Sequence, residues 1–230
     1  MRYIGPPRSF GHTSYAKRGI VIHSTEGTGT AEGEARYAMR RTDGTSSHYY
    51  VDGKEVIQSL SVKFGANHVG STYGNTQLIS YEFCGRASWS TTKWMTSIDW
   101  KEAAAAIAAN CKTYSIPARR GSVSQLRSHD KGIYTHNDCR LALGGTDHTD
   151  PGSAFPVKHL LTLVNEILTP EEDDDMTPKD MAQADVFPAP SKWLETHPPK
   201  DADDATWNLG TYLKSLKDQL DRLEARLDKE

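Results

Sequence analysis

The chain has 230 residues, which is enough for one domain of about 150 to 200 residues and an appendage. Hydrophobic residues make up 37% of the chain and charged residues 25%, which is typical of a globular protein. The formal net charge of -3 gives no reason to expect a nucleic-acid partner.

No targeting or membrane-spanning segment is evident. Residues 1–8 lack the apolar run of about 7 to 15 residues that a signal peptide contains, and no stretch reaches the roughly 18 apolar residues of a spanning helix. We therefore expect synthesis in a cytoplasm and no membrane insertion. The cysteines (Cys84, Cys111 and Cys139) are odd in number and widely spaced, so we expect reduced thiols rather than a disulfide framework.

Short apolar runs and helical spacings alternate in the first 169 residues. Strands are predicted at residues 19–23, 49–51, 55–58 and 78–83, with Asp52-Gly53 as a hairpin turn between the second and the third. Helices are predicted at residues 31–41, 97–114 and 157–168. This order favours an α/β fold in which helices flank a mixed central β-sheet.

The composition changes after residue 169. Residues 170–205 are acidic and proline-rich, which is typical of a linker. Within residues 206–230, a 4-3-4-3-4 spacing of leucines predicts a coiled-coil helix: Leu209, Leu213, Leu216, Leu220, Leu223 and Leu227. An amphipathic helix that lies on its own domain is the alternative, although it would usually present a wider apolar face. We expect a homo-oligomer through residues 206–230, of open strand number.

Two of the nine histidines stand where chemistry is expected. His23 and His136 each end a short apolar run, and side chains at the carboxyl ends of strands often line the clefts of sheet-based enzymes. Asp147, His148 and Asp150 follow in a turn. Two histidines and a carboxylate can hold zinc through three ligands and leave a fourth position for water.

Six short segments carry a resemblance to a known family. They are Ile22-His23-Ser24-Thr25-Glu26-Gly27, Ser47-His48-Tyr49-Tyr50-Val51-Asp52-Gly53, Asn67-His68-Val69-Gly70, Ile79-Ser80-Tyr81-Glu82, Thr135-His136-Asn137-Asp138 and Thr149-Asp150-Pro151-Gly152. Their order resembles that of N-acetylmuramoyl-L-alanine amidase family 2, which includes phage endolysins and peptidoglycan recognition proteins. The resemblance covers about residues 17–168 and is greatest to the amidase domain of endolysins from phages of actinobacteria. It implies a peptidoglycan recognition protein-like fold.

The resemblance implies a ligand set for Zn²⁺. In that family two histidines and a cysteine or aspartate hold zinc, and the third ligand immediately precedes Pro-Gly, which implies His23, His136 and Asp150 here. Cys139 is a rival third ligand because thiolate binds zinc well, but its place three residues after His136 does not fit the family pattern. His148 remains another near neighbour, as does Asp147.

The resemblance also implies two catalytic residues. Glu82 matches the glutamate that some members use to activate water, while a surface glutamate on an alternating strand is the alternative. Other members use a tyrosine at the position of Ser47, which favours Glu82. His148 stands where many members have a lysine that stabilises the developing negative charge. Its contribution would depend on pH near about 6 to 7.

Two further histidines are candidate substrate-binding residues. His68 matches a histidine near the family's substrate groove. His48 is placed with it, and a supporting or structural role for His48 is the alternative.

The resemblance implies a zinc hydrolase that cleaves the amide between N-acetylmuramic acid and L-alanine in bacterial peptidoglycan. Such an endolysin would be made in the host cytoplasm without a signal peptide and would act on the cell wall after release. A recognition module that binds peptidoglycan without cutting it is the alternative, and the presence of all three proposed ligands argues against it. A different zinc peptidase on the same scaffold is a third possibility.

Overall fold

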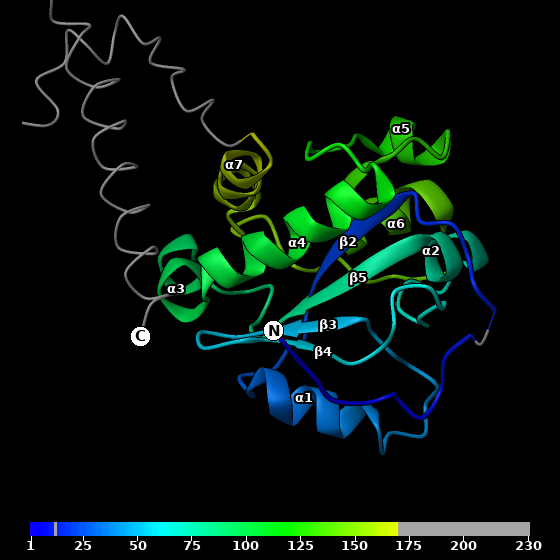
Figure 1. The fold of residues 1–230 in the computed structure, drawn as a ribbon, viewed down its shortest axis with the longest axis horizontal. Coiled ribbons are helices and arrows are strands. Elements are labelled where there is room, and N and C mark those ends of the chain that lie inside the picture. The colour runs from blue at the N-terminus through cyan, green and yellow to red at the C-terminus, as the bar shows by residue number, and fades with distance from the viewer. Residues whose placement is uncertain (12, 170–230) are drawn as a thin grey trace, which may run out of the picture. The chain divides into compact units, whose positions relative to one another are not determined.

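The computed structural model describes residues 1–11 and 13–169, so the predicted linker at 170–205 and coiled coil at 206–230 lie outside the described residues. In this part of the chain a mixed sheet has the strand order β1-β4-β3-β5-β2-β6. Figure 1 labels its strands β4, β3, β5 and β2. The strands are β1 (Arg2–Tyr3), β2 (Gly19–Ser24), β3 (Tyr49–Val51), β4 (Val56–Gln58), β5 (Leu78–Phe83) and β6 (Gly132–Thr135). Neighbouring strands are parallel except β3 and β4, which are antiparallel.

The mixed sheet with flanking helices confirms the predicted fold class. The four predicted strands correspond to β2, β3, β4 and β5, while β1 and β6 are not among them. The predicted hairpin joins β3 to β4, and the Asp52 carboxylate stabilises its turn by accepting hydrogen bonds from the backbone N–H groups of Lys54 and Glu55. Here a local side-chain acceptor fixes the turn that the sequence predicts.

The described helices are α1 (Ala31–Ala38), α2 (Thr72–Gln77), α3 (Thr91–Ser97), α4 (Trp100–Tyr114), α5 (Val123–Arg127), α6 (His136–Leu143) and α7 (Val157–Leu168). The helix predicted at 157–168 is α7, and α1 ends three residues earlier than predicted. The helix predicted at 97–114 was wrong at its start, because Ser97 ends α3 and Ile98 is extended. Asp99 then caps α4, and its side chain accepts a hydrogen bond from the N–H of Glu102.

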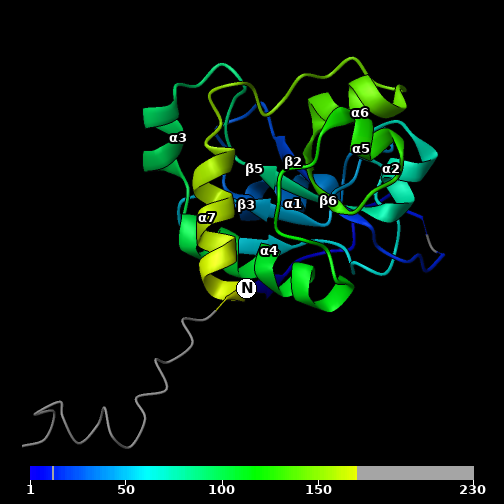
Figure 2. The same ribbon diagram turned by 90° about the horizontal axis from the view of Figure 1, so that it is seen from above.

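The two faces of the sheet have different roles because successive side chains of a strand point to opposite faces. On one face, Ile20, Ile22, Ile79, Tyr81 and Phe83 are buried in the cluster that includes residues of α4 and α7. These two helices pack against each other over this face (Figure 2). The main apolar core therefore lies between the sheet and this helix pair.

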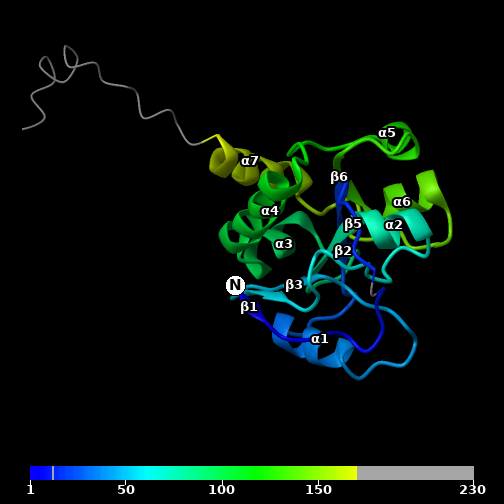
Figure 3. The same cartoon turned by 45° about the vertical axis from the view of Figure 1, so that its right-hand side comes forward.

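The opposite face is covered at its two sides by different helices. Helix α1 packs on β3 and β4, whereas α6 packs on β2 and β6 (Figure 3). Residues of α5 and α6 form an apolar cluster with residues of β2, β5 and β6. Strands β5 and β2 are the central strands of the sheet order. At their carboxyl ends this face carries His23 and Glu82, which are register partners.

All three cysteines are free thiols and are buried. Among the described helices, none is both long and apolar enough to span a bilayer.

Candidate metal centre

His23 lies on one of the most enclosed strands of the sheet. Strand β2 pairs with β5 over its whole length and with β6 over residues 19–22, so both of its edges are paired up to the residue before His23. The His23 side chain is 2% exposed. A rigid strand thus positions this imidazole.

His136 was predicted at the end of an apolar strand. In the structure β6 ends at Thr135, and His136 is the first residue of α6. The reason is a capping box: the Thr135 hydroxyl accepts a hydrogen bond from the N–H of Asp138, whose carboxylate accepts from the N–H of Thr135. The helix therefore begins where the strand stops. This junction directs His136 toward the end of β2.

Asp150 reaches the same point from the loop between α6 and α7. Its carboxylate Oδ2 accepts a hydrogen bond of 3.0 Å from the backbone N–H of Ser24, the last residue of β2. Its backbone carbonyl accepts a hydrogen bond of 3.2 Å from the N–H of Asn137 in α6. Both contacts tie the loop to the elements that carry the two histidines.

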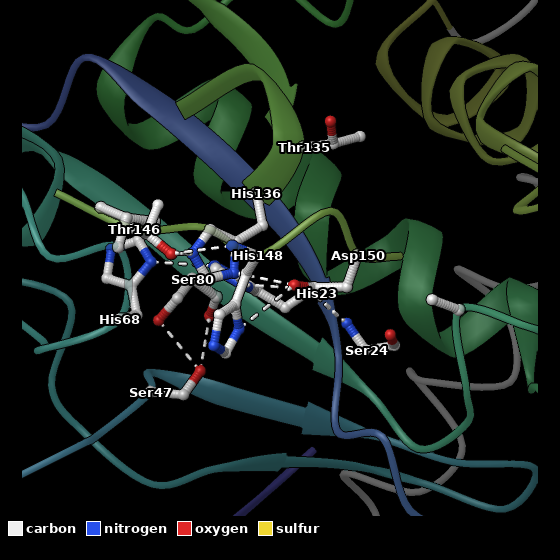
Figure 4. Close-up of polar contacts among 12 residues, drawn as sticks. His23, Ser24, Ser47, His68, Ser80, Thr135, His136, Thr146, His148 and Asp150 are labelled. Carbon is white, nitrogen blue, oxygen red and sulfur yellow. Dashed lines mark hydrogen bonds and ion pairs between the residues drawn. The ribbon is translucent and has the colours of Figure 1, made fainter. Parts of the chain in front are cut away.

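The three side chains converge on one small volume (Figure 4). The two Nδ1 atoms of His23 and His136 are 3.0 Å apart. The Nδ1 of His136 lies 2.9 Å from Asp150 Oδ1, and the Nδ1 of His23 lies 3.5 Å from Asp150 Oδ2. One ligand atom from each of the three buried residues fits within 4.8 Å of the others, as a shared metal ion requires.

These distances fit zinc. Zn–N bonds of about 2.0 Å in a tetrahedron separate neighbouring ligand atoms by about 3.3 Å, close to the separations among these three side chains. Two imidazoles and one carboxylate also form a known type of catalytic ligand set that leaves a fourth position for water or substrate. His23, His136 and Asp150 could therefore hold a zinc ion without rearrangement of the fold.

The protonation states also suit a metal. Burial lowers the pKa of His23 to about 4, although Asp150 acts in the opposite direction, so this imidazole is neutral near pH 7. The backbone N–H of Ser24 donates a hydrogen bond to the Asp150 carboxylate, which favours the ionised form of this group. A neutral imidazole and an ionised carboxylate are the forms that bind zinc.

Glu82 lies on β5 beside His23 and on the same face of the sheet. It is partly buried. Burial raises its pKa to about 8, and the nearby Asp150 and Glu34 act in the same direction. A carboxyl group with a pKa raised toward neutral is well suited to exchange protons with a substrate.

His148 lies on the solvent side of the ligand cluster. Its side chain is 64% exposed, its Nδ1 is 3.7 Å from Asp150 Oδ1, and its ring centroid is 4.9 Å from that of His136. The neighbouring Asp147 carboxylate is fully exposed. His148 thus turns its Nδ1 toward the candidate metal centre.

The family profile described as N-acetylmuramoyl-L-alanine amidase matches residues 14–153, which is more than half of the chain. The chain belongs to this family. The matched range contains all three ligand candidates, together with Glu82 and His148.

Individual amidases are similar over shorter stretches. The N-acetylmuramoyl-L-alanine amidase XlyB of Bacillus subtilis is 31% identical over 113 residues, which cover 48% of this chain and 33% of XlyB. The amidase CwlA of the same organism is 35% identical over 68 residues, or 28% of this chain and 25% of CwlA. The matched regions thus span about a third or less of these curated relatives.

A solved structure supports the fold. The crystal structure of the Staphylococcus aureus hydrolase AmiA in complex with its ligand superposes with a TM-score of 0.58. The alignment covers 73% of this chain and 82% of that one at 21% sequence identity. At this identity the likeness concerns the fold of the amidase-family domain.

Cys139, the rival ligand, lies elsewhere in this amidase-family domain. It is fully buried in the apolar cluster with Val21, Val69, Leu126 and Tyr134. Burial raises the pKa of its thiol, which disfavours the thiolate that zinc would need. The structure therefore gives Cys139 a packing role.

The two histidines predicted to contact substrate are both buried. His48 is completely buried, with its ring nitrogens 3.0 Å from Ser80 Oγ and 3.1 Å from the carbonyl oxygen of Phe64. His68 is 6% exposed and its Nδ1 is 2.9 Å from His23 Nε2. Because both side chains are buried, their positions favour a role in holding neighbouring residues of the site over direct contact with substrate.

Thr146 contributes to the site but was not among the sequence candidates. Its hydroxyl oxygen lies 3.1 Å from Nε2 of His136 and accepts a hydrogen bond from the backbone N–H of His148. A threonine in a glycine-rich loop has no sequence pattern that reveals such a contact. Only the loop geometry brings it to the histidine.

Proposed function

We propose that this chain is a zinc-dependent amidase that hydrolyses the bond between N-acetylmuramic acid and L-alanine in bacterial peptidoglycan. The observation that carries the proposal is the convergence of His23, His136 and Asp150 within 4.8 Å in a chain that belongs to the amidase family. The bond itself is inferred from the family description and from the names of the relatives.

His23, His136 and Asp150 would hold the zinc ion. When bound there, zinc would polarise the scissile carbonyl and lower the pKa of a water molecule toward about 7. The Ser24 N–H keeps the Asp150 carboxylate in place.

Glu82 would act as the general base and then as the general acid. In its ionised form it takes a proton from the attacking water as the new C–O bond forms. It then gives that proton to the nitrogen of L-alanine as the C–N bond breaks. The products are the lactyl carboxylic acid on the glycan and a peptide with a free amino group on L-alanine. A single carboxylate can serve both steps because it lies on the same sheet face as His23.

His148 would stabilise the negative charge that develops on the carbonyl oxygen. Its position on the solvent side of Asp150 leaves the ring accessible to a substrate, and either ring nitrogen can donate a hydrogen bond when protonated. His148 thus takes the role that the resemblance assigns to a lysine in many members.

A peptidoglycan-binding module without hydrolytic activity is the second candidate function. It would need neither a complete set of zinc ligands nor a carboxyl group with a pKa near neutral beside them. Both features are present among the described residues, which favours the enzyme.

The proposed setting is the lysis of a bacterial cell wall by a phage endolysin that acts after release from the cytoplasm. Homo-oligomerisation through residues 206–230 remains a prediction from the leucine spacing. Because the wall is a polymer, joined copies would bind it with higher avidity than single ones. Removal of residues 171–230 should then weaken binding to whole walls and spare cleavage of a small soluble muropeptide.

The proposal is tested by digestion of purified peptidoglycan with the native protein and with Asp150→Ala, followed by mass spectrometry of the products. We expect glycan strands with free lactyl groups and intact peptides that begin with L-alanine from the native protein only. Products cut within the stem peptide would instead indicate a zinc peptidase. Binding without any products would indicate a recognition module.

A further inference from the structure

A second imidazole lies behind His23, on the side away from Asp150. The Nε2 of His23 is 2.9 Å from Nδ1 of His68, and the two rings meet edge to face at 79°. The Nε2 of His68 is in turn 3.2 Å from the backbone carbonyl oxygen of Gly74. The three groups form a hydrogen-bonded chain that ends at the candidate metal centre.

The direction of every hydrogen bond in this chain follows from the carbonyl group. A carbonyl oxygen only accepts, so His68 must carry a proton on Nε2. Both imidazoles are buried, which favours their neutral forms with one N–H each. Because the proton of His68 is on Nε2, its Nδ1 accepts the hydrogen bond from His23. His23 therefore donates from Nε2, and its Nδ1 is left with a free lone pair.

That free lone pair faces the ligand cluster, since His23 Nδ1 lies 3.0 Å from His136 Nδ1 and 3.5 Å from Asp150 Oδ2. We propose that His68 is a positioning residue that holds His23 in the tautomer protonated on Nε2, the form that can ligate a metal ion through Nδ1. The inference rests on the proposed function only in taking zinc as that ion.

The role of His68 follows from the competing tautomer. A carboxylate such as Asp150 attracts a proton to the nearest imidazole nitrogen, which for His23 is Nδ1. A proton on that atom would block ligation. The acceptor on His68 opposes this effect because loss of the Nε2 proton would leave two facing nitrogen atoms without a proton between them.

His68 is itself held firmly. The side-chain oxygen of Asn75 accepts hydrogen bonds of 2.9 Å from the backbone N–H groups of both His68 and Val69. Two residues further on, Gly70 has a φ of +68° and lies so close to Gly145 that a Cβ atom on Gly70 would be 1.9 Å from the Gly145 carbonyl oxygen. The His68 loop and the loop that carries Asp150 are therefore closely packed at this point.

The test compares two substitutions at one position in the full-length protein. His68→Asn keeps an acceptor close to the place of Nδ1, whereas His68→Leu has a similar size and no acceptor. Zinc affinity is measured by competition with a chelator. We expect His68→Leu to bind zinc about 10- to 100-fold more weakly than the native protein and His68→Asn to stay close to it. Equal zinc affinity of the native and His68→Leu proteins would overturn the proposal.

A second readout needs neither zinc nor activity. In the native full-length protein labelled with ¹⁵N on histidine, NMR should show the shared proton bonded to His23 Nε2 and a coupling across the hydrogen bond to His68 Nδ1. A proton bonded to His68 Nδ1 would overturn the proposal, even if His68→Leu failed to fold. If the native protein bound no zinc, the proposed function would fail while the location of this proton could still be read.

Discussion

The two faces of the central sheet are built from the same strands but differ in what their side chains do. On β5, Ile79 and Tyr81 point to the face under α4 and α7 and are completely buried, whereas Ser80 and Glu82 point to the face of the candidate metal centre. One face thus stabilises the fold by burial of apolar surface. The other face also carries apolar clusters under α1 and under α5 and α6, but at the carboxyl ends of β2 and β5 it holds the polar groups of the candidate site. We call the two the apolar face and the polar face, and substitutions on them should have separable effects.

The largest expected effect on the polar face is that of Glu82→Gln. This nearly isosteric change removes the base and should lower kcat/KM by about 10²- to 10⁴-fold. The zinc content and the unfolding midpoint should stay close to the native values, because Glu82 is not among the three proposed ligands. Near-native kcat/KM in steady-state assays on a soluble muropeptide would show that another residue is the base.

On the apolar face of the same strand, Ile79→Ala should lower stability and leave kcat/KM nearly unchanged, the reverse of Glu82→Gln. Its side chain is completely buried, so its truncation should lower the free energy of unfolding by about 2 to 5 kcal/mol. Urea unfolding measures this loss. The folded fraction should keep its kcat/KM, and a selective loss of activity without loss of stability would break the proposed separation between the faces.

The pH dependence of activity is expected to come from the polar face. The base works only when ionised, and the pKa of Glu82 is raised to about 8 by burial, with Asp150 in the same direction. A nearby zinc ion would lower this pKa. The value of kcat/KM should therefore fall about tenfold per pH unit on the acid side of a pKa at or below about 8. At saturating zinc this acid limb should be absent from Glu82→Gln, and its persistence there would assign it to another group.

The smallest expected effect is that of His148→Ala. Loss of a buried donor to an oxyanion typically costs about 10²- to 10³-fold in kcat, but the His148 side chain is 64% exposed, so water can replace part of its contribution. We expect a decrease of about tenfold in kcat with KM nearly unchanged. A change in KM alone would instead assign His148 to substrate binding.

Much of the apolar face could be predicted from the sequence, because burial leaves a periodic pattern. The short apolar runs at residues 19–23 and 78–83 and the helical spacing of residues 157–168 correspond to β2, β5 and α7. The break between α3 and α4 was missed because a long alanine-rich helix hides its start. Asp99 was the available sign, as a typical helix N-cap three residues before Glu102.

The polar face was predicted less completely. The resemblance indicated His23, His136 and Asp150, and the structure places them together. Thr135 and Asp138 have the spacing of a capping box, which is the sequence sign that α6 starts at His136. The contact between His68 and His23 could not be predicted, because it depends on a loop whose path carries no periodic pattern.

The central claim is that His23, His136 and Asp150 together hold one catalytic zinc ion. The most direct measurement is the zinc content and affinity of the full-length native protein, of Asp150→Ala and of Ile79→Ala, determined on folded and metal-stripped samples titrated with zinc. We predict one tightly bound zinc ion in the native protein and in folded Ile79→Ala, and a loss of tight binding in Asp150→Ala. A native protein that binds no zinc, or an Asp150→Ala variant that binds it as tightly as the native protein, would contradict the account.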